Sequence, residues 1–362
     1  MVEKKVSAPQ FFSLLFLSLL STIFMYVSST EVTIAETETV LRPLVFILIS
    51  VLVSIPSYFI FKEYKKGESD GVRVEKRLFF KVMALIYALV YFIGSLRSVA
   101  RFDLFASSEL FPGSEMTFFI IGIIVACGLL SSLGLGALCR GGVVFSFLVV
   151  AVTGFVMVSL KDEINILNFT PLFREGIGNF FFDSLLLSVQ ATELGTIILF
   201  LPEIKGNMKK HFFGWLILSA ISFSAIFFFV IGSLGPFADT QLFPTYSSVT
   251  LADFGLLKRI DALETSIWIF CVVEKISFYI LIVTRCIHYA FEKLPSKYVR
   301  IGICVILSCI LVFISGNVKH FAFMSDMRIV SVLYALVAFL LPVAVLIYLK
   351  KVKPYEKVSE NN

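Results

Sequence analysis

Residues 180 to 201 read FFFDSLLLSVQATELGTIILFL, an apolar stretch that polar and small residues interrupt near its middle. A helix needs roughly 20 apolar residues to cross the hydrocarbon core of a bilayer, and this stretch has that length. An ionisable side chain at such depth costs about 2.5 to 3.5 kcal/mol on insertion scales, so it marks a functional site by default. The interruption consists of Ser188, Gln190, Thr192, Glu193, Gly195 and Thr196. The stretch therefore predicts a membrane-spanning helix with a functional centre.

The composition extends this interpretation to the whole chain. Of the 362 residues, 58% are hydrophobic and 16% are charged, whereas about a quarter of the residues of an ordinary soluble domain are charged. The net charge of +5 comes from short basic clusters between apolar stretches, which argues against a nucleic-acid partner. We therefore predict an all-α integral membrane protein whose main solvent is the lipid bilayer.

Ten apolar segments are long enough to cross the membrane. The link between the fourth and fifth segments is placed at residues 140–142, and the ninth segment is short. The predicted spans are residues 8–28, 43–61, 79–100, 116–138, 142–160, 180–201, 212–234, 262–284, 298–315 and 329–349. They form a single domain over residues 1–362, because no loop between them is large enough to fold separately.

The distribution of lysine and arginine orients these spans. Cytoplasmic loops of membrane proteins hold most of their basic residues. In the predicted topology, alternate connections hold most of the lysines and arginines, for example residues 62–81, 205–210 and 350–357. This distribution predicts that both termini lie in the cytoplasm.

Two further ionisable residues lie within a predicted span. Glu274 and Lys275 are neighbours at the centre of the eighth span. Because neighbours on a helix point roughly 100° apart, they cannot simply neutralise each other, and at least one is expected to have a partner on another helix. Together with Ser277, they are candidates for the coupling of an ion or a proton. The alternative is that these charges only fix the packing of the helices.

Polar residues also recur in the first and third spans. In the third span, Tyr87, Tyr91, Gly94, Ser95 and Ser98 recur at helical spacing, and their hydroxyls would be costly against lipid, so this face should look inward. In the first span Ser18, Ser21 and Thr22 interrupt the apolar run, although a hydroxyl can also bond back to its own helix. The candidate substrate-binding residues are Ser18, Ser21, Thr22, Tyr87, Tyr91, Ser95, Gln190, Thr192, Glu193, Gly195 and Thr196.

The positions of the polar spans suggest an internal repeat. Spans one and six are five apart, so they correspond if the chain consists of two inverted five-helix repeats, about residues 8–160 and 180–349, with the site at their interface. The sequence contains no HExxH, GxSxG or phosphate-loop pattern. Its six cysteines lie in or beside apolar segments without CxxC spacing. We therefore expect no catalytic residues, no metal site and no cofactor.

Several motifs follow one another in order along the chain. They are the opening from Ser7 to Ser18, Gly134 to Arg140, Glu193 with Pro202, and Phe243 to Trp268. In this order they resemble the GerAB-type spore germination proteins, within the amino acid, polyamine and organocation transporter superfamily. The resemblance implies a LeuT-like fold of two inverted repeats in which the first and sixth helices are unwound. It also implies a nutrient germinant receptor B subunit in the spore inner membrane, beside A and C subunits.

Three hypotheses follow. In the first, the chain is a receptor subunit that binds an amino acid or a similar nutrient. Glu193 attracts the ammonium group of the nutrient or holds the unwound sixth helix, and backbone amides of the broken first helix bind its carboxylate. Tyr87 and Tyr91 close over the ligand. In the second, it is a stand-alone proton-coupled amino acid permease in which Lys275 or Glu274 carries the proton. In the third, it is a membrane scaffold with a vestigial site.

Overall fold

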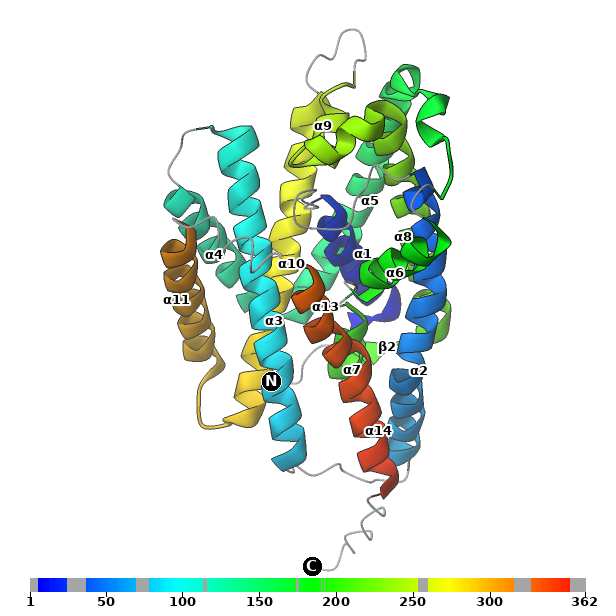
Figure 1. Cartoon of the computed structure of the whole chain (residues 1–362). Coiled ribbons are helices and arrows are strands. Elements are labelled where there is room, and N and C mark those ends of the chain that lie inside the picture. Colours follow the sequence, from blue (N-terminus) through cyan, green and yellow to red (C-terminus); the bar gives the residue numbers. More distant parts are fainter. Residues whose placement is uncertain are drawn as a thin grey trace, which may run out of the picture.

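A computed structural model describes residues 6–24, 37–69, 78–112, 116–173, 176–189, 191, 193–252, 260–315 and 327–351. The described chain is almost entirely helical, and its long helices run up and down in one bundle (Figure 1). Helix α9 lies near one end of this bundle and α14 reaches the other, so we name these the α9 end and the α14 end. The α-helices are α1 (Ala8–Phe24), α2 (Arg42–Ser69), α3 (Leu78–Phe105), α4 (Met116–Ser132), α5 (Leu135–Ser159), α6 (Ile177–Val189), α7 (Glu193–Phe200), α8 (Met208–Leu234), α9 (Pro244–Val249), α10 (Ile260–Ala290), α11 (Ser296–Ser315), α13 (Met327–Ala335) and α14 (Leu341–Lys351).

Short elements connect and interrupt these helices. Two π-helical turns, η2 (Ala106–Leu110) and η7 (Leu336–Leu340), continue α3 and join α13 to α14. The 3-10 turns are η1 (Thr37–Leu41), η3 (Lys161–Glu163), η4 (Ile166–Phe169), η5 (Leu201–Glu203) and η6 (Gly235–Thr240). Two short strands, β1 (Val6–Ser7) and β2 (Ile204–Lys205), pair in parallel with Val6 opposite Ile204.

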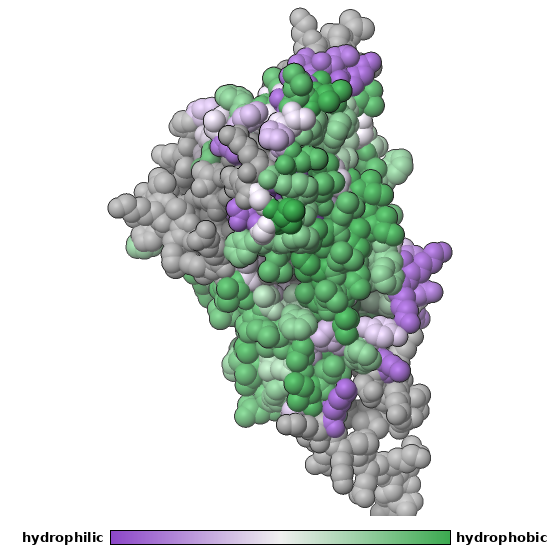
Figure 2. All heavy atoms as spheres, turned by 45° about the vertical axis from the view of Figure 1, so that its right-hand side comes forward, coloured by the Kyte–Doolittle hydropathy of each residue, from purple (hydrophilic) through white to green (hydrophobic). Residues whose placement is uncertain are grey.

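The apolar segments of the sequence correspond to these helices. Among the described residues, eight helical segments are long and apolar enough to cross a membrane, and two shorter apolar helices, Ala8–Phe24 and Phe118–Ser132, correspond to the first and fourth predicted spans. The total of ten crossings stays a prediction. Figure 2 shows the consequence for the surface: apolar residues cover the side of the bundle, and hydrophilic residues collect toward its ends. This surface suits a lipid environment, because lipid imposes no cost on exposed apolar side chains.

Two details differ from the sequence-based expectation. The turn between the fourth and fifth spans lies at Leu133 and Gly134, not at residues 140–142, so Arg140 is inside α5. Gly134 has a φ of 81°, which a residue with a Cβ rarely adopts, and this explains why the helix breaks there. The first helix is also uninterrupted from Ala8 to Phe24, so the break implied by the resemblance does not occur within these residues.

Helix α10 lies at the centre of the bundle and contacts α1, α3, α4, α5 and α11. Close approaches between the inner helices depend on glycines. A Cβ at Gly142 of α5 would lie 3.0 Å from the backbone of Leu14 in α1, and a Cβ at Gly94 of α3 would lie 3.0 Å from the Tyr279 ring of α10. Small residues at such positions let membrane helices approach closely. The arrangement brings α1, α3, α5 and α10 together around one interior.

Two ion pairs join segments that are far apart in the sequence. Arg42 at the start of α2 and Asp183 in α6 lie 3.0 Å apart, and Arg42 is 3% exposed. The predicted second span begins one residue after Arg42, whose partner lies 141 residues away in the sequence. Toward the α14 end, Arg285 of α10 pairs with Glu203, which directly precedes strand β2. The Arg285 guanidinium also lies 5.0 Å from the centre of the Phe200 ring.

Candidate functional site

The sixth span is interrupted where its polar residues lie. Helix α6 ends at Val189 and α7 begins at Glu193, so the prediction of a broken sixth helix is confirmed. Glu193 lies in the first turn of α7, where the helix dipole favours a negative charge. The Thr196 hydroxyl donates a hydrogen bond to the Glu193 carbonyl at 2.7 Å. The interruption thus presents a carboxylate at the amino terminus of a short helix inside the bundle.

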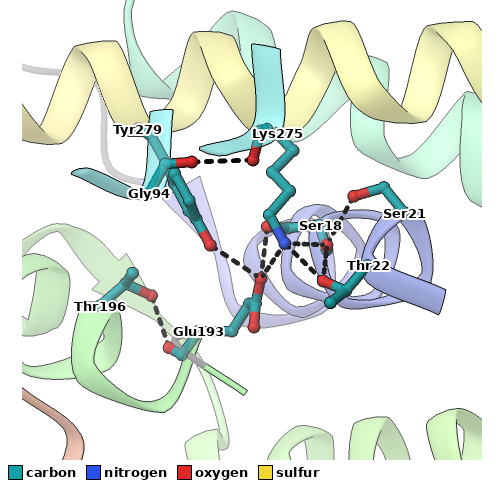
Figure 3. A network of polar contacts seen from close by, with 9 residues as sticks. Ser18, Ser21, Thr22, Gly94, Glu193, Thr196, Lys275 and Tyr279 are labelled. Atoms are coloured by element: carbon teal, nitrogen blue, oxygen red, sulfur yellow. Dashed lines mark hydrogen bonds and ion pairs between the residues drawn. The ribbon is translucent and has the colours of Figure 1, made fainter. Parts of the chain in front are cut away.

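One carboxylate oxygen of Glu193 is the centre of a polar network (Figure 3). Its Oε1 accepts a hydrogen bond from the Ser18 hydroxyl of α1 at 2.6 Å and from the Tyr279 hydroxyl of α10 at 3.4 Å. Lys275 of α10 lies 3.5 Å from the same atom. Glu193 is completely buried, and its Oε2 has no hydrogen-bond partner among the described residues. The network therefore leaves one oxygen of the carboxylate for a further donor.

The Lys275 ammonium joins three helices. Besides Glu193 of α7, it donates to the Ser18 carbonyl of α1 at 2.9 Å and to the Thr22 hydroxyl. It also lies 5.3 Å from the centre of the Tyr279 ring, a cation–π arrangement. The expectation that one member of the Glu274–Lys275 pair has a partner on another helix is confirmed.

The tyrosines of the third span line the same interior. Tyr87 and Tyr91 are buried, and their rings stack with centroids 6.3 Å apart. The Tyr87 hydroxyl donates to the Val337 carbonyl of the π-helical turn η7 at 3.2 Å. A Cβ at Gly195 would lie 3.0 Å from the Tyr91 hydroxyl and 2.6 Å from a methyl of Val337, so a glycine is needed there. α3, α7 and η7 thus meet beside Glu193.

Some of the predicted site residues make no hydrogen bond to Glu193 or Lys275 in the described part of the chain. The hydroxyls of Ser21, Ser95 and Ser277 each donate to a carbonyl of their own helix, those of Ser18, Tyr91 and Val273 respectively. Such local bonding satisfies a hydroxyl without any ligand or ion. Gln190 and Thr192 lie outside the described residues. Glu274 also lies elsewhere, against α5, where a Cβ at Gly141 would be 3.4 Å from its Oε1.

Other residues near the network were absent from the sequence interpretation. Tyr279 lies one turn after Lys275, and this spacing could have identified it. Tyr334 of α13 and Arg97 of α3 share a side-chain hydrogen bond. Arg97 and Arg101 of α3 lie within electrostatic range of Lys275. Both are almost completely buried. The described residues contain no group of three or more metal-ligating side chains.

Comparisons with known proteins place this arrangement in a family. The sequence profile described as spore germination protein matches residues 5–323. No curated protein matches the chain. The fold is similar to that of a Na+-coupled sialic acid symporter in a substrate-bound outward-open state, with a TM-score of 0.59 and 13% sequence identity over 98% of this chain and 92% of that one. At this identity the similarity shows the fold alone. The chain therefore belongs to the spore germination protein family and is an integral membrane protein with a LeuT-like transporter fold.

Proposed function

We propose that this protein is the membrane subunit of a spore nutrient germinant receptor. It binds an amino acid or a similar small nutrient at the Glu193 network and triggers germination together with A and C subunits. The observation that carries this proposal is the ion pair of Glu193 and Lys275 at the break of the sixth span. The proposal includes the spore inner membrane as the location and cytoplasmic termini, which the distribution of basic residues favours.

An amino acid suits this ion pair because it carries both charges. The distance between Lys275 and Glu193 is 3.5 Å, longer than the roughly 2.7 to 2.9 Å of a strong charge-assisted hydrogen bond. A zwitterion that inserts here places its ammonium at Glu193 and its carboxylate at Lys275, so one loose ion pair is replaced by two. Glu193 Oε2, which has no partner among the described residues, accepts from that ammonium.

The same exchange explains how binding could be signalled. Lys275 connects α10 to α1 and α7, so a ligand that separates Lys275 from Glu193 changes the contacts between these helices. A ligand shifts a conformational equilibrium only by its differential affinity for two states. In this proposal the second state is the one in which partner subunits are activated.

Nutrient-dependent stabilisation of the purified chain tests the proposal. In detergent or nanodiscs, a mixture of L-amino acids should raise the unfolding temperature of the unmodified protein. Glu193→Gln removes the charge and should abolish this rise, whereas Glu163→Gln, which changes an exposed carboxylate of η3, should retain it. An undiminished rise in Glu193→Gln would remove the residue from the binding site. In spores, Glu193→Gln should abolish germination in response to the nutrient, and the A and C subunits should co-purify with both variants.

The transporter fold supports a second candidate, a permease that moves its ligand across the membrane. Uptake by liposomes that contain only this chain separates the two. Accumulation of radiolabelled amino acids without partner subunits favours the permease, and saturable binding without accumulation favours the receptor.

A further inference from the structure

A second set of buried acidic groups lies away from the Glu193 network, along the contact between α5 and α10. Glu264 and Glu274 are both on α10, and they are 7% and 2% exposed. Ten residues of α-helix separate them by about 15 Å along the helix axis, which is about half the thickness of a hydrocarbon core. The Glu193 network instead meets α10 through Lys275 and Tyr279. The two carboxyls therefore form a separate feature.

Each carboxyl has a neighbour on α5. The Thr153 hydroxyl donates to Glu264 Oε1 at 3.2 Å, and Gly141 leaves space for both oxygens of Glu274. Glu264 Oε2 and Glu274 Oε1 are buried and have no hydrogen-bond partner among the described residues. A buried carboxylate without a cation is costly, whereas the protonated form is neutral and is itself a donor.

Two buried cysteines lie along the same contact. Cys271 is completely buried on α10 and lies within electrostatic range of both Glu264 and Glu274. Cys139 of α5 lies within range of Glu274 and also of Glu203 at the α14 end. The sequence of polar groups from the α9 end is therefore Glu264, Cys271, Glu274, Cys139 and Glu203.

The charged and titratable groups around each carboxyl are few. Cys127 of α4, Cys139 of α5 and Cys271 of α10 lie within electrostatic range of Glu274, and Cys271 also lies within range of Glu264. Lys275, the neighbour of Glu274, turns away to α1 and α7. Arg140, Glu203 and Arg285 lie near Cys139 toward the α14 end. In the described part of the chain, Lys275 pairs with Glu193 and Arg285 pairs with Glu203.

We propose that the α5–α10 contact is a proton pathway, in which Glu264 and Glu274 each bind and release a proton between the α9 end and the α14 end. Chains of buried carboxyls are a common form of proton relay in membrane proteins. Glu274 releases its proton to water toward the α14 end and takes another through bridging water from Glu264. A hydronium ion from the α9 end then reprotonates Glu264, so that one proton crosses and both carboxyls return to their starting form. Water molecules bridge the gaps that exceed hydrogen-bonding distance. The two carboxyls of this pathway are separate from the Glu193 network.

Proton flux into liposomes tests this proposal. Purified chain is reconstituted into liposomes that contain a pH-sensitive dye, and an acidic external buffer is added with and without a mixture of L-amino acids. The unmodified chain should admit protons several-fold faster than protein-free liposomes in at least one condition. Glu264→Gln and Glu274→Gln should each reduce the flux to the protein-free rate, and Glu163→Gln, an exposed carboxylate just beyond α5, should leave it unchanged. Protein-free rates for the unmodified chain in both conditions, or full flux in both variants, overturn the proposal.

Infrared spectroscopy keeps the proposal testable where a variant fails to reconstitute. At neutral pH the unmodified chain should show the carbonyl stretching band of protonated carboxyls, and each of the two variants should lose part of it. An absent band, or a band unchanged in both variants, overturns the proposal. The proposed receptor function fails in a different measurement: amino acids would then not raise the unfolding temperature of the unmodified chain. That result does not involve residues 264 and 274, so the two proposals can fail independently.

Discussion

The Glu193 carboxylate and the Lys275 ammonium lie 3.5 Å apart inside the bundle, although 82 residues separate them in the chain. Both side chains are almost completely buried, and their pairing fixes the broken sixth span against α10. Lys275 has Glu274 as its neighbour in sequence, yet its ammonium contacts α1 and α7. The charge pattern of this site is therefore decided by how three helices face one another.

Removal of one member of this pair should be strongly destabilising. Lys275→Met leaves the Glu193 carboxylate buried without its cation, and breaking a buried ion pair in this way costs about 3 to 5 kcal/mol. The double change Lys275→Met with Glu193→Gln removes both charges and should recover most of the loss. Unfolding temperatures in detergent measure both effects. Equal stability of the single and double variants would contradict the pairing.

Two buried serines one turn apart in α1 should differ in their effect. Ser18 donates at 2.6 Å to the Glu193 carboxylate, and a hydrogen bond to a charged group contributes about 1.5 to 3 kcal/mol. Ser21 donates only to a carbonyl of its own helix in the described contacts, so Ser21→Ala should cost about 0.5 kcal/mol or less. Thermal unfolding of Ser18→Ala and Ser21→Ala compares them directly, and similar losses would argue against a central role for Ser18.

A methyl group at residue 195 should not fit. A Cβ there would lie 2.6 Å from a methyl of Val337 and 3.0 Å from the Tyr91 hydroxyl, so Gly195→Ala should cost about 1 to 3 kcal/mol through overpacking. Gly214→Ala is the matched control, because a Cβ at that exposed position of α8 meets nothing within 4 Å. Adding Val337→Ala to Gly195→Ala should restore stability. If it does not, the strain lies elsewhere than in the contact of α7 with η7.

The contact of Glu203 with Arg285 should control access from the α14 end. This pair and the β1–β2 pairing hold the segment after α7 against α10 and the start of α1. Glu203→Ala should therefore increase severalfold the rate at which a maleimide modifies Cys139, which is completely buried. Mass spectrometry of peptides measures this rate, and the exposed Cys309 provides an internal reference. An unchanged ratio of Cys139 to Cys309 labelling would show that the pair does not restrict access.

Much of the fold could be predicted from the sequence. Placing charged groups and unsatisfied backbone groups in lipid is costly, and the local sequence shows where such groups occur. The apolar segments and the interruption of the sixth span around Glu193 could therefore be predicted. The turn between α4 and α5 was misplaced, because Arg140 suggested a loop while the backbone breaks at Gly134. The break that the resemblance implies for the first helix is not found within Ala8–Phe24: Ser21 and Thr22 bond to a carbonyl of their own helix, while the Ser18 hydroxyl reaches Glu193.

The sequence by itself determined that this is an integral membrane protein. It also determined the positions of the apolar segments and of the polar residues within them. Each of these depends on the hydrophobicity of a local segment, so no knowledge of neighbouring helices is needed. Only the tertiary structure decided that Lys275 meets Glu193, that Glu274 lies against Gly141, and that the π-helical turn at Val337 reaches Tyr87. These contacts depend on the rotation and depth of each helix, which are set by packing among distant segments.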